Sequence, residues 1–221
     1  MGTKDLFYSS VTKKIVMAVA GLFLISFLML HLGINLLMLR SDGGALFSKA
    51  VHFMTTNPVI KVFEVVLFGG FFIHILFGVT LQVYNWIARP KRYKVEGFSH
   101  TSFFSKYMIH IGAIILVFLA IHFTNFYFVK LELVDPPAGV ARHDFYTMAQ
   151  LLFSSDFYAI LYIVLMVFLG FHLQHAFQSA FQTLGLAHSK YTSVIKAIGT
   201  VYAIVVPLGF ALIPVYFIFF K

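Results

Sequence analysis

Residues 65–88 of the chain read VVLFGGFFIHILFGVTLQVYNWIA, a run of 24 residues without an aspartate, glutamate, lysine or arginine. A helix of about 20 such residues spans the hydrocarbon core of a bilayer. Four more stretches lack these charged residues, and they are Ile15–Leu39, Tyr107–Val129, Phe157–Ser189 and Ala197–Phe220. In the fourth stretch, Gly185–Ser189 predicts a helix stop followed by a loop.

The five apolar runs predict helices and not strands. Backbone groups in lipid have to be hydrogen-bonded within a helix or in a closed barrel. Barrel strands alternate polar and apolar residues, and these runs do not. Pro207 and Pro214 fall in the fifth run, where a membrane helix tolerates a kink. The sequence therefore predicts an all-α integral membrane bundle of five transmembrane helices, folded as one domain over residues 1–221.

The composition supports a membrane location and excludes several kinds of site. Charged residues make up 11% of the chain, against about 25% in a soluble domain. The net charge is +8, but the basic residues lie between apolar runs, so they predict topology and not nucleic-acid binding. The chain has no cysteine, which excludes disulfides, iron–sulfur clusters bound by this chain and covalent haem attachment.

The connections between the runs predict the orientation. Ten lysines and arginines fall on the side of the N-terminus and six on the other side. Because basic loops stay in the cytoplasm, we expect a cytoplasmic N-terminus and a periplasmic C-terminus. The first run is too long for a signal peptide and is expected to be retained. Of the connections, Arg89–Ser102 is short and basic, and Leu131–Asp156 is expected to form an ordered cap.

Ionisable residues inside membrane spans are costly and usually functional. Six of the ten histidines lie in the predicted spans, and they are His31, His74, His110, His122, His172 and His175. At about 1.5 Å per residue, His31 and His122 lie roughly 12–14 Å from the outer boundary. By the same measure, His74 and His172 lie roughly 24 Å from it. The histidines thus form two couples at two depths, each couple drawn from two helices.

Two imidazoles at one depth suit a haem, because haem iron takes axial ligands from both faces of the ring. Zinc is an alternative, but it prefers several ligands in one tetrahedral site. Small residues would let a flat ring approach a helix. Glycines lie near three of these histidines in the sequence, with Gly69, Gly70 and Gly78 around His74, Gly21 and Gly33 around His31, and Gly170 before His172.

The remaining histidines in the spans allow more than one interpretation. His110 lies four residues after Lys106 near the inner surface, and the two either bind a haem propionate or are interfacial polar residues. His175 lies three residues after His172 and shares its face of the helix. It is an alternative ligand, or it supports the edge of the haem together with Gln178 and Ser179.

The chain resembles the cytochrome b subunit of bacterial succinate dehydrogenase and fumarate reductase, in the form with one anchor chain and two haems. The resemblance covers nearly the whole chain. It is carried by Ser9–Lys14, Ala20–Phe23, His31–Leu36, Thr56–Pro58, Glu64, His74–Gly78, Asn85–Pro90, Phe171–Ser179 and Thr183–Gly185.

The resemblance implies two haem b groups between helices one to four. The outer (distal) haem iron would take His31 and His122, and the inner (proximal) iron His74 and His172, with His172 favoured over His175. It also implies a flavoprotein subunit with FAD and an iron–sulfur subunit as partners in a bacterial inner membrane, with menaquinone or another quinone as substrate. A higher oligomer of the complex stays open.

The quinone site and proton route are expected at the outer side. Glu64 is the acid near the outer edge of a span, and His52, Asn57 and Lys61 lie near it in the sequence, so this group is the candidate quinone site. Some members of the family carry an acid two residues before the helix-four ligand, and here that position is Gly170. A proton route through that position is therefore in doubt.

Two other functions remain open from the sequence. One is the cytochrome b anchor of another quinone-linked enzyme, such as a hydrogenase or formate dehydrogenase. The other is a transporter whose midplane histidines relay protons, although the repeats and broken helices of transporters are not evident in this sequence.

Overall fold

The computed structural model describes the chain except for residues 1–9, 89–102, 187, 189 and 221. Five of its segments are helical, long and apolar enough to cross a membrane, as the sequence predicts. They are α2 (Ser10–Asn35) continued by the 3₁₀ turn η1 (Leu36–Leu39), α4 (Pro58–Ile87), α5 (Phe103–His122) continued by η2 (Phe123–Tyr127) and α6 (Phe128–Lys130), α8 (Asp156–Thr183), and α9 (Thr192–Phe219). Two short helices, α3 (Ala45–Thr56) and α7 (Phe145–Phe153), join them on one side.

The second spanning helix begins seven residues earlier than the expected start at Val65. Asn57 caps α4, because its side chain accepts hydrogen bonds from the backbone N–H groups of Val59 and Ile60. Pro58 occupies the first helical position, where its missing N–H costs nothing. The absence of charged residues therefore marked the apolar part of this helix and not its end.

The fourth spanning helix ends as the sequence predicts. α8 stops at Thr183, and Gly185 follows with φ +77. This backbone conformation is strained for residues with a Cβ atom, so glycine is the residue that commonly ends a helix in this way. The basic connection Arg89–Ser102, which includes His100, lies outside the described residues.

α8 is the centre of the bundle. It packs along α9 on one side and against α2 and α5 on the others. At two glycines α8 and α9 come very close, since a Cβ added to Gly170 would lie 3.0 Å from the carbonyl oxygen of Ala203, and one added to Gly199 would lie 2.7 Å from Phe177 Cδ1. Tyr202 of α9 also donates a hydrogen bond of 2.6 Å to the carbonyl oxygen of Ile25 in α2.

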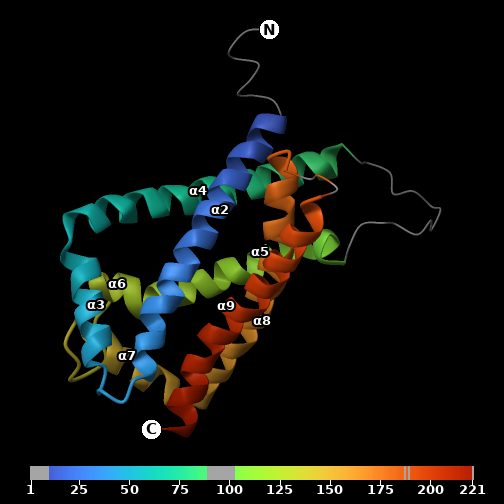
Figure 1. The fold of residues 1–221 in the computed structure, drawn as a ribbon. Coiled ribbons are helices and arrows are strands. Elements are labelled where there is room, and N and C mark those ends of the chain that lie inside the picture. Colours follow the sequence, from blue (N-terminus) through green and yellow to red (C-terminus); the bar gives the residue numbers. More distant parts are fainter. Residues whose placement is uncertain (1–9, 89–102, 187, 189, 221) are drawn as a thin grey trace.

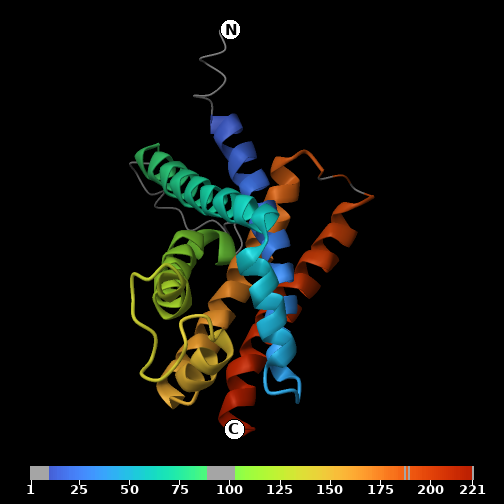
Figure 2. The same ribbon diagram turned by 90° about the vertical axis from the view of Figure 1, so that its left-hand side faces the viewer.

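The other two spanning helices run at steep angles to this group. α4 packs mainly against α2, and α5 packs mainly against α8. The ribbons of α4 and α5 stay apart over most of their length in both views (Figures 1 and 2). The four helices that carry the buried histidines are thus arranged as two crossing pairs.

The side that carries α3 and α7 is closed by a second apolar core. Phe47 of α3, Ala149 and Phe153 of α7, and Phe217 of α9 are buried there. Gly44 starts α3 with φ +81, and a side chain at this position would overlap the ring of Tyr146. The connection Leu131–Asp156 therefore does contain an ordered cap, formed by α7 and the turns before it.

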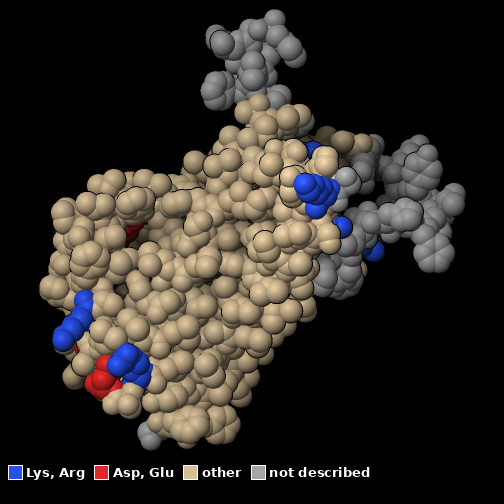
Figure 3. Space-filling model, viewed as in Figure 1, with Lys and Arg blue, Asp and Glu red and all other residues tan. Residues whose placement is uncertain are grey.

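Charged side chains gather at the two ends of the face shown in Figure 3, with a broad band of other residues between them. α2 begins at one end of the molecule and α9 finishes at the opposite end (Figure 1). This distribution is the one expected of a multi-pass membrane protein.

Candidate functional site

The first histidine couple joins α2 to α5. The ring centres of His31 and His122 lie 5.8 Å apart, and their planes are at 78° to each other. Four phenylalanine rings surround the couple, with centres 5.2 to 5.8 Å from one of the imidazoles, and they are Phe27, Phe118, Phe126 and Phe210. These rings come from α2, α5, the π-helical turn η2 and α9, and they keep water away from the imidazoles.

Asn35 fixes the position of His31 from within α2. Its side-chain Nδ2 donates a hydrogen bond of 2.7 Å to the backbone carbonyl oxygen of His31. The same nitrogen lies 3.3 Å from His31 Nδ1. A polar residue one turn further along the helix therefore limits the rotation of this imidazole.

The second couple joins α4 to α8. The ring centres of His74 and His172 lie 6.1 Å apart, with their planes at 75°. Glycines from two other helices face these rings, since a Cβ added to Gly21 would lie 3.5 Å from His74 Cε1 and one added to Gly112 would lie 4.0 Å from His172 Cε1. The sequence assigned Gly21 to His31, and that was wrong because α4 crosses α2 at this level and brings His74 to Gly21.

A cavity of about 60 Å³ lies beside His74. Its wall is made by α2, α4 and α8, and it contains many small side chains. The lining residues are Met17, Ala18, Gly21, Ile25, His74, His175, Ala176, Ser179, Ala180 and Thr183. His175, Ser179 and Thr183 follow one another at intervals of four residues, so they lie along one face of α8.

Three of the four paired imidazoles have a buried Nδ1 atom without a hydrogen-bond partner in the described part of the chain, and they belong to His74, His122 and His172. Buried polar atoms are nearly always paired in proteins, so each such atom needs an explanation.

The distance between the two ring centres of each couple is the distance expected of two axial ligands. An imidazole nitrogen lies about 2 Å from a bound metal ion and about 1 Å from its own ring centre, so two rings on opposite sides of one ion have centres about 6 Å apart.

Each couple therefore brings two imidazoles together from two different helices. The outer couple offers aromatic walls, and the inner couple offers glycines and open space. Within residues 10–88, 103–186, 188 and 190–220, no three histidine, aspartate or glutamate side chains come together as a metal site.

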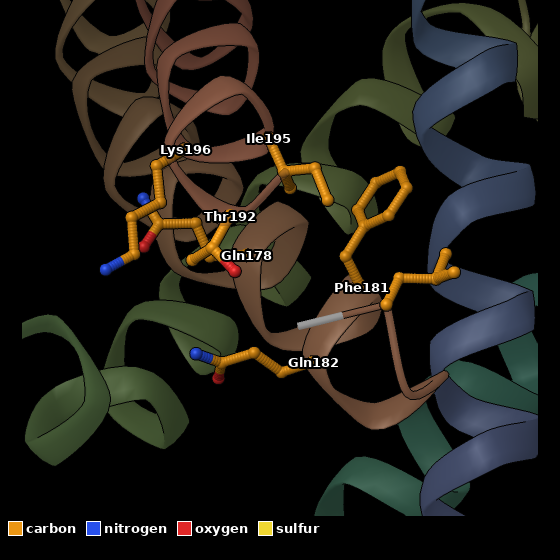
Figure 4. Close-up of a pocket in the computed structure, with 7 residues that line it drawn as sticks. Gln178, Phe181, Gln182, Thr192, Ile195 and Lys196 are labelled. Atoms are coloured by element: carbon orange, nitrogen blue, oxygen red, sulfur yellow. The ribbon is translucent and has the colours of Figure 1, made fainter. Parts of the chain in front are cut away.

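Four other residues were predicted to contact a cofactor, and they are His110, Lys106, His175 and Gln178. His110 and Lys106 are exposed, and the contacts that the structure gives them are with Tyr107, whose ring centre lies 6.0 Å from that of His110 and 5.5 Å from Lys106 Nζ. His175 lines the cavity beside His74. Gln178 instead lines a separate shallow recess between α8 and α9 with Gln182, Thr192 and Lys196 (Figure 4).

The structure places the residues of the candidate quinone group on α3 and at the start of α4. Glu64 is bound by residues of the third spanning segment, since Lys130 Nζ lies 2.7 and 2.8 Å from its two carboxylate oxygens and the Tyr127 hydroxyl donates a bond of 2.6 Å. His52 is exposed on α3, and Asn57 serves as the helix cap. An acid inside a span needs a cation at similar depth, and that rule would have pointed to Lys130.

The π-helical turn η2 directly after His122 was also missed. Such turns are frequent at functional sites, but they have no sequence signature as clear as a capping residue. In comparisons with known proteins, no family model, curated protein or solved structure matches the chain. Its function is therefore inferred from the two histidine couples.

Proposed function

We propose that this chain is the membrane anchor and electron-transfer subunit of a succinate:quinone or fumarate:quinone oxidoreductase, and that it holds two b-type haems. One observation carries the proposal. Four histidines from four helices meet in two couples, with ring centres 5.8 and 6.1 Å apart, which is the spacing of axial imidazoles on one iron. The pairs are those expected from depth in the sequence.

In this proposal, side chains of the protein would bind the two haems and shield them from water. His31 and His122 would hold the outer haem, and His74 and His172 the inner one. A bound haem supplies a one-electron carrier whose potential depends on its ligands and surroundings. The phenylalanines around the outer couple exclude water, and Gly21 and Gly112 leave room beside the inner couple.

The proposal assigns different partners to the two ends of the molecule. The end where α2 begins carries Lys13, Lys14, Lys190 and Lys196 among its described residues, and it would face the cytoplasm and dock the iron–sulfur subunit, which in turn binds the FAD-containing flavoprotein. The quinone would approach the opposite end near the outer couple. There the polar group consists of Glu64, Tyr127 and Lys130 and replaces the predicted group with His52.

The decisive experiment is a visible spectrum of the purified protein with haem counted per chain. We expect two haems per chain and the reduced α-band of b-type haem. His31→Ala and His122→Ala should each remove the same haem, and His74→Ala and His172→Ala the other. A colourless preparation from cells supplied with iron and haem precursors would refute the proposal, and would favour a proton-relaying transporter.

The identity of the enzyme is tested by the subunits that accompany the chain. Co-purification of a flavin-containing subunit with succinate or fumarate turnover would support the proposal. Co-purification with a metal-dependent hydrogenase or formate dehydrogenase subunit, with two haems present, would keep the haem sites and reject the enzyme.

A further inference from the structure

The start of α4 is tied to the end of the third spanning segment by a compact polar group. Glu64 accepts from Lys130 Nζ at 2.7 and 2.8 Å and from the Tyr127 hydroxyl at 2.6 Å. The side chains of the ion pair are both 22% exposed. Hydrogen bonds between charged groups are the strong ones, and partial burial protects them from solvent screening.

Both partners of Glu64 lie in the segment that follows His122. The π-helical turn η2 runs from Phe123 to Tyr127, so Tyr127 is its last residue, and Lys130 ends α6 three residues later. A π-helical turn is rare and needs support from its surroundings to persist. The hydrogen bonds to Glu64 give that support from a different helix.

Aromatic rings continue the connection toward the histidines. Phe68, one turn after Glu64 on α4, has its ring centre 4.7 Å from that of Tyr127 and 5.5 Å from that of Phe123. Phe123 in turn lies 6.3 Å from the ring of His122. Because the ribbons of α4 and α5 otherwise run apart (Figure 1), this end is where α4 can control the third spanning segment.

We propose that Glu64, Tyr127 and Lys130 are positioning residues that hold the π-helical turn, and thereby set the orientation of the His122 imidazole against His31. The inference rests on the proposed function, because it treats His122 as a haem ligand. Without the carboxylate, the ammonium of Lys130 moves to water and the π-helical turn relaxes toward regular α-helix. One residue fewer is then accommodated in the turn, and the imidazole that precedes it rotates.

The test uses the complex as purified, and electron paramagnetic resonance of its oxidised haems. The signal of a low-spin ferric iron with two imidazoles depends on the angle between the ring planes, which is 78° for the outer couple. We expect Glu64→Gln and Lys130→Gln to shift one of two signals, namely the one that is missing from His31→Ala. The other signal should keep its wild-type position.

Two further variants separate positioning from general loosening. The double variant Glu64→Lys, Lys130→Glu restores the ion pair with its charges exchanged and should return the shifted signal toward wild type. Asp135→Asn is the control for the loss of a carboxylate, because it breaks an exposed ion pair with Arg142 at 3.4 Å that includes no residue of η2. It should leave both signals unchanged.

Three results would overturn the inference. They are both signals at wild-type positions in Glu64→Gln, equal shifts of both signals, or a charge-exchanged variant that stays shifted. Failure of the proposed function is seen separately, because wild-type protein without haem would show neither signal before any variant is made.

Discussion

Replacing Gly21 by leucine should remove the inner haem and spare the outer one. Gly21 lies on α2 opposite His74, and a Cβ there would sit 3.5 Å from His74 Cε1, which is an ordinary contact. Position 21 can therefore accommodate alanine. Leucine carries three more carbon atoms, and they would extend into the cavity of about 60 Å³ beside His74.

The expected magnitude follows from overpacking, which costs about 1–3 kcal/mol in a well-packed site. At about 1.4 kcal/mol per tenfold, haem binding at the inner couple should weaken about 5- to 150-fold. The empty protein should not lose stability, because glycine is about 0.5–1 kcal/mol worse than leucine in a helix and the side chain fills existing space.

The assay is haem per chain by reduced spectrum, followed by titration of the purified variant with haemin. Gly33→Leu is the control on the same helix, since nothing lies within 4 Å of its added Cβ. We expect about one haem per chain in Gly21→Leu and two in both Gly21→Ala and Gly33→Leu. Two tightly bound haems in Gly21→Leu, or equal losses in both leucine variants, would refute the assignment of the cavity to the inner haem.

Three other outcomes are expected. Gly44→Ala should lower the melting temperature in detergent by more than Gly43→Ala. Both glycines have positive φ, but only a methyl group at position 44 would overlap the ring of Tyr146. We expect the two variants to lose about 3 and about 1 kcal/mol of stability, respectively, and equal melting temperatures would contradict this. Asn57→Ala removes the cap of α4 and should cost about 1 kcal/mol in the same measurement, with an unchanged melting temperature as the contrary result. His175→Ala should keep both haems, and loss of the inner one would make His175 a ligand.

The sequence was sufficient to predict five helices and the histidines that meet. Charged residues mark where each helix leaves the lipid, so counting from Arg40, Pro58, Lys130 and Asp156 gave the depth of each imidazole. Equal depth makes a meeting of two side chains possible, and the facing sides of the helices then decide whether they meet. The pairing of His31 with His122, and that of the deeper two, is confirmed as proximity, while their role as ligands stays a prediction.

Details that depend on helix crossing could not be predicted. Gly21 precedes His31 by ten residues on the same helix, but it faces His74 because α4 crosses α2 steeply. The partners of Glu64 come from a helix 63 to 66 residues away. A single sequence allows the depth of a residue along its helix to be predicted. It does not allow the rotation of one helix relative to another to be predicted.

The glycine contacts of α8 with α9 have a consequence for assembly. Each couple takes one imidazole from α2 or α8 and one from α4 or α5. Gly170 and Gly199 allow α8 to pack closely on α9, and Tyr202 joins α9 to α2 by a hydrogen bond. These three helices therefore form one packed unit, and α4 and α5 lie against it. Under the proposed function, each haem would lie between this packed unit and one of the two helices α4 and α5.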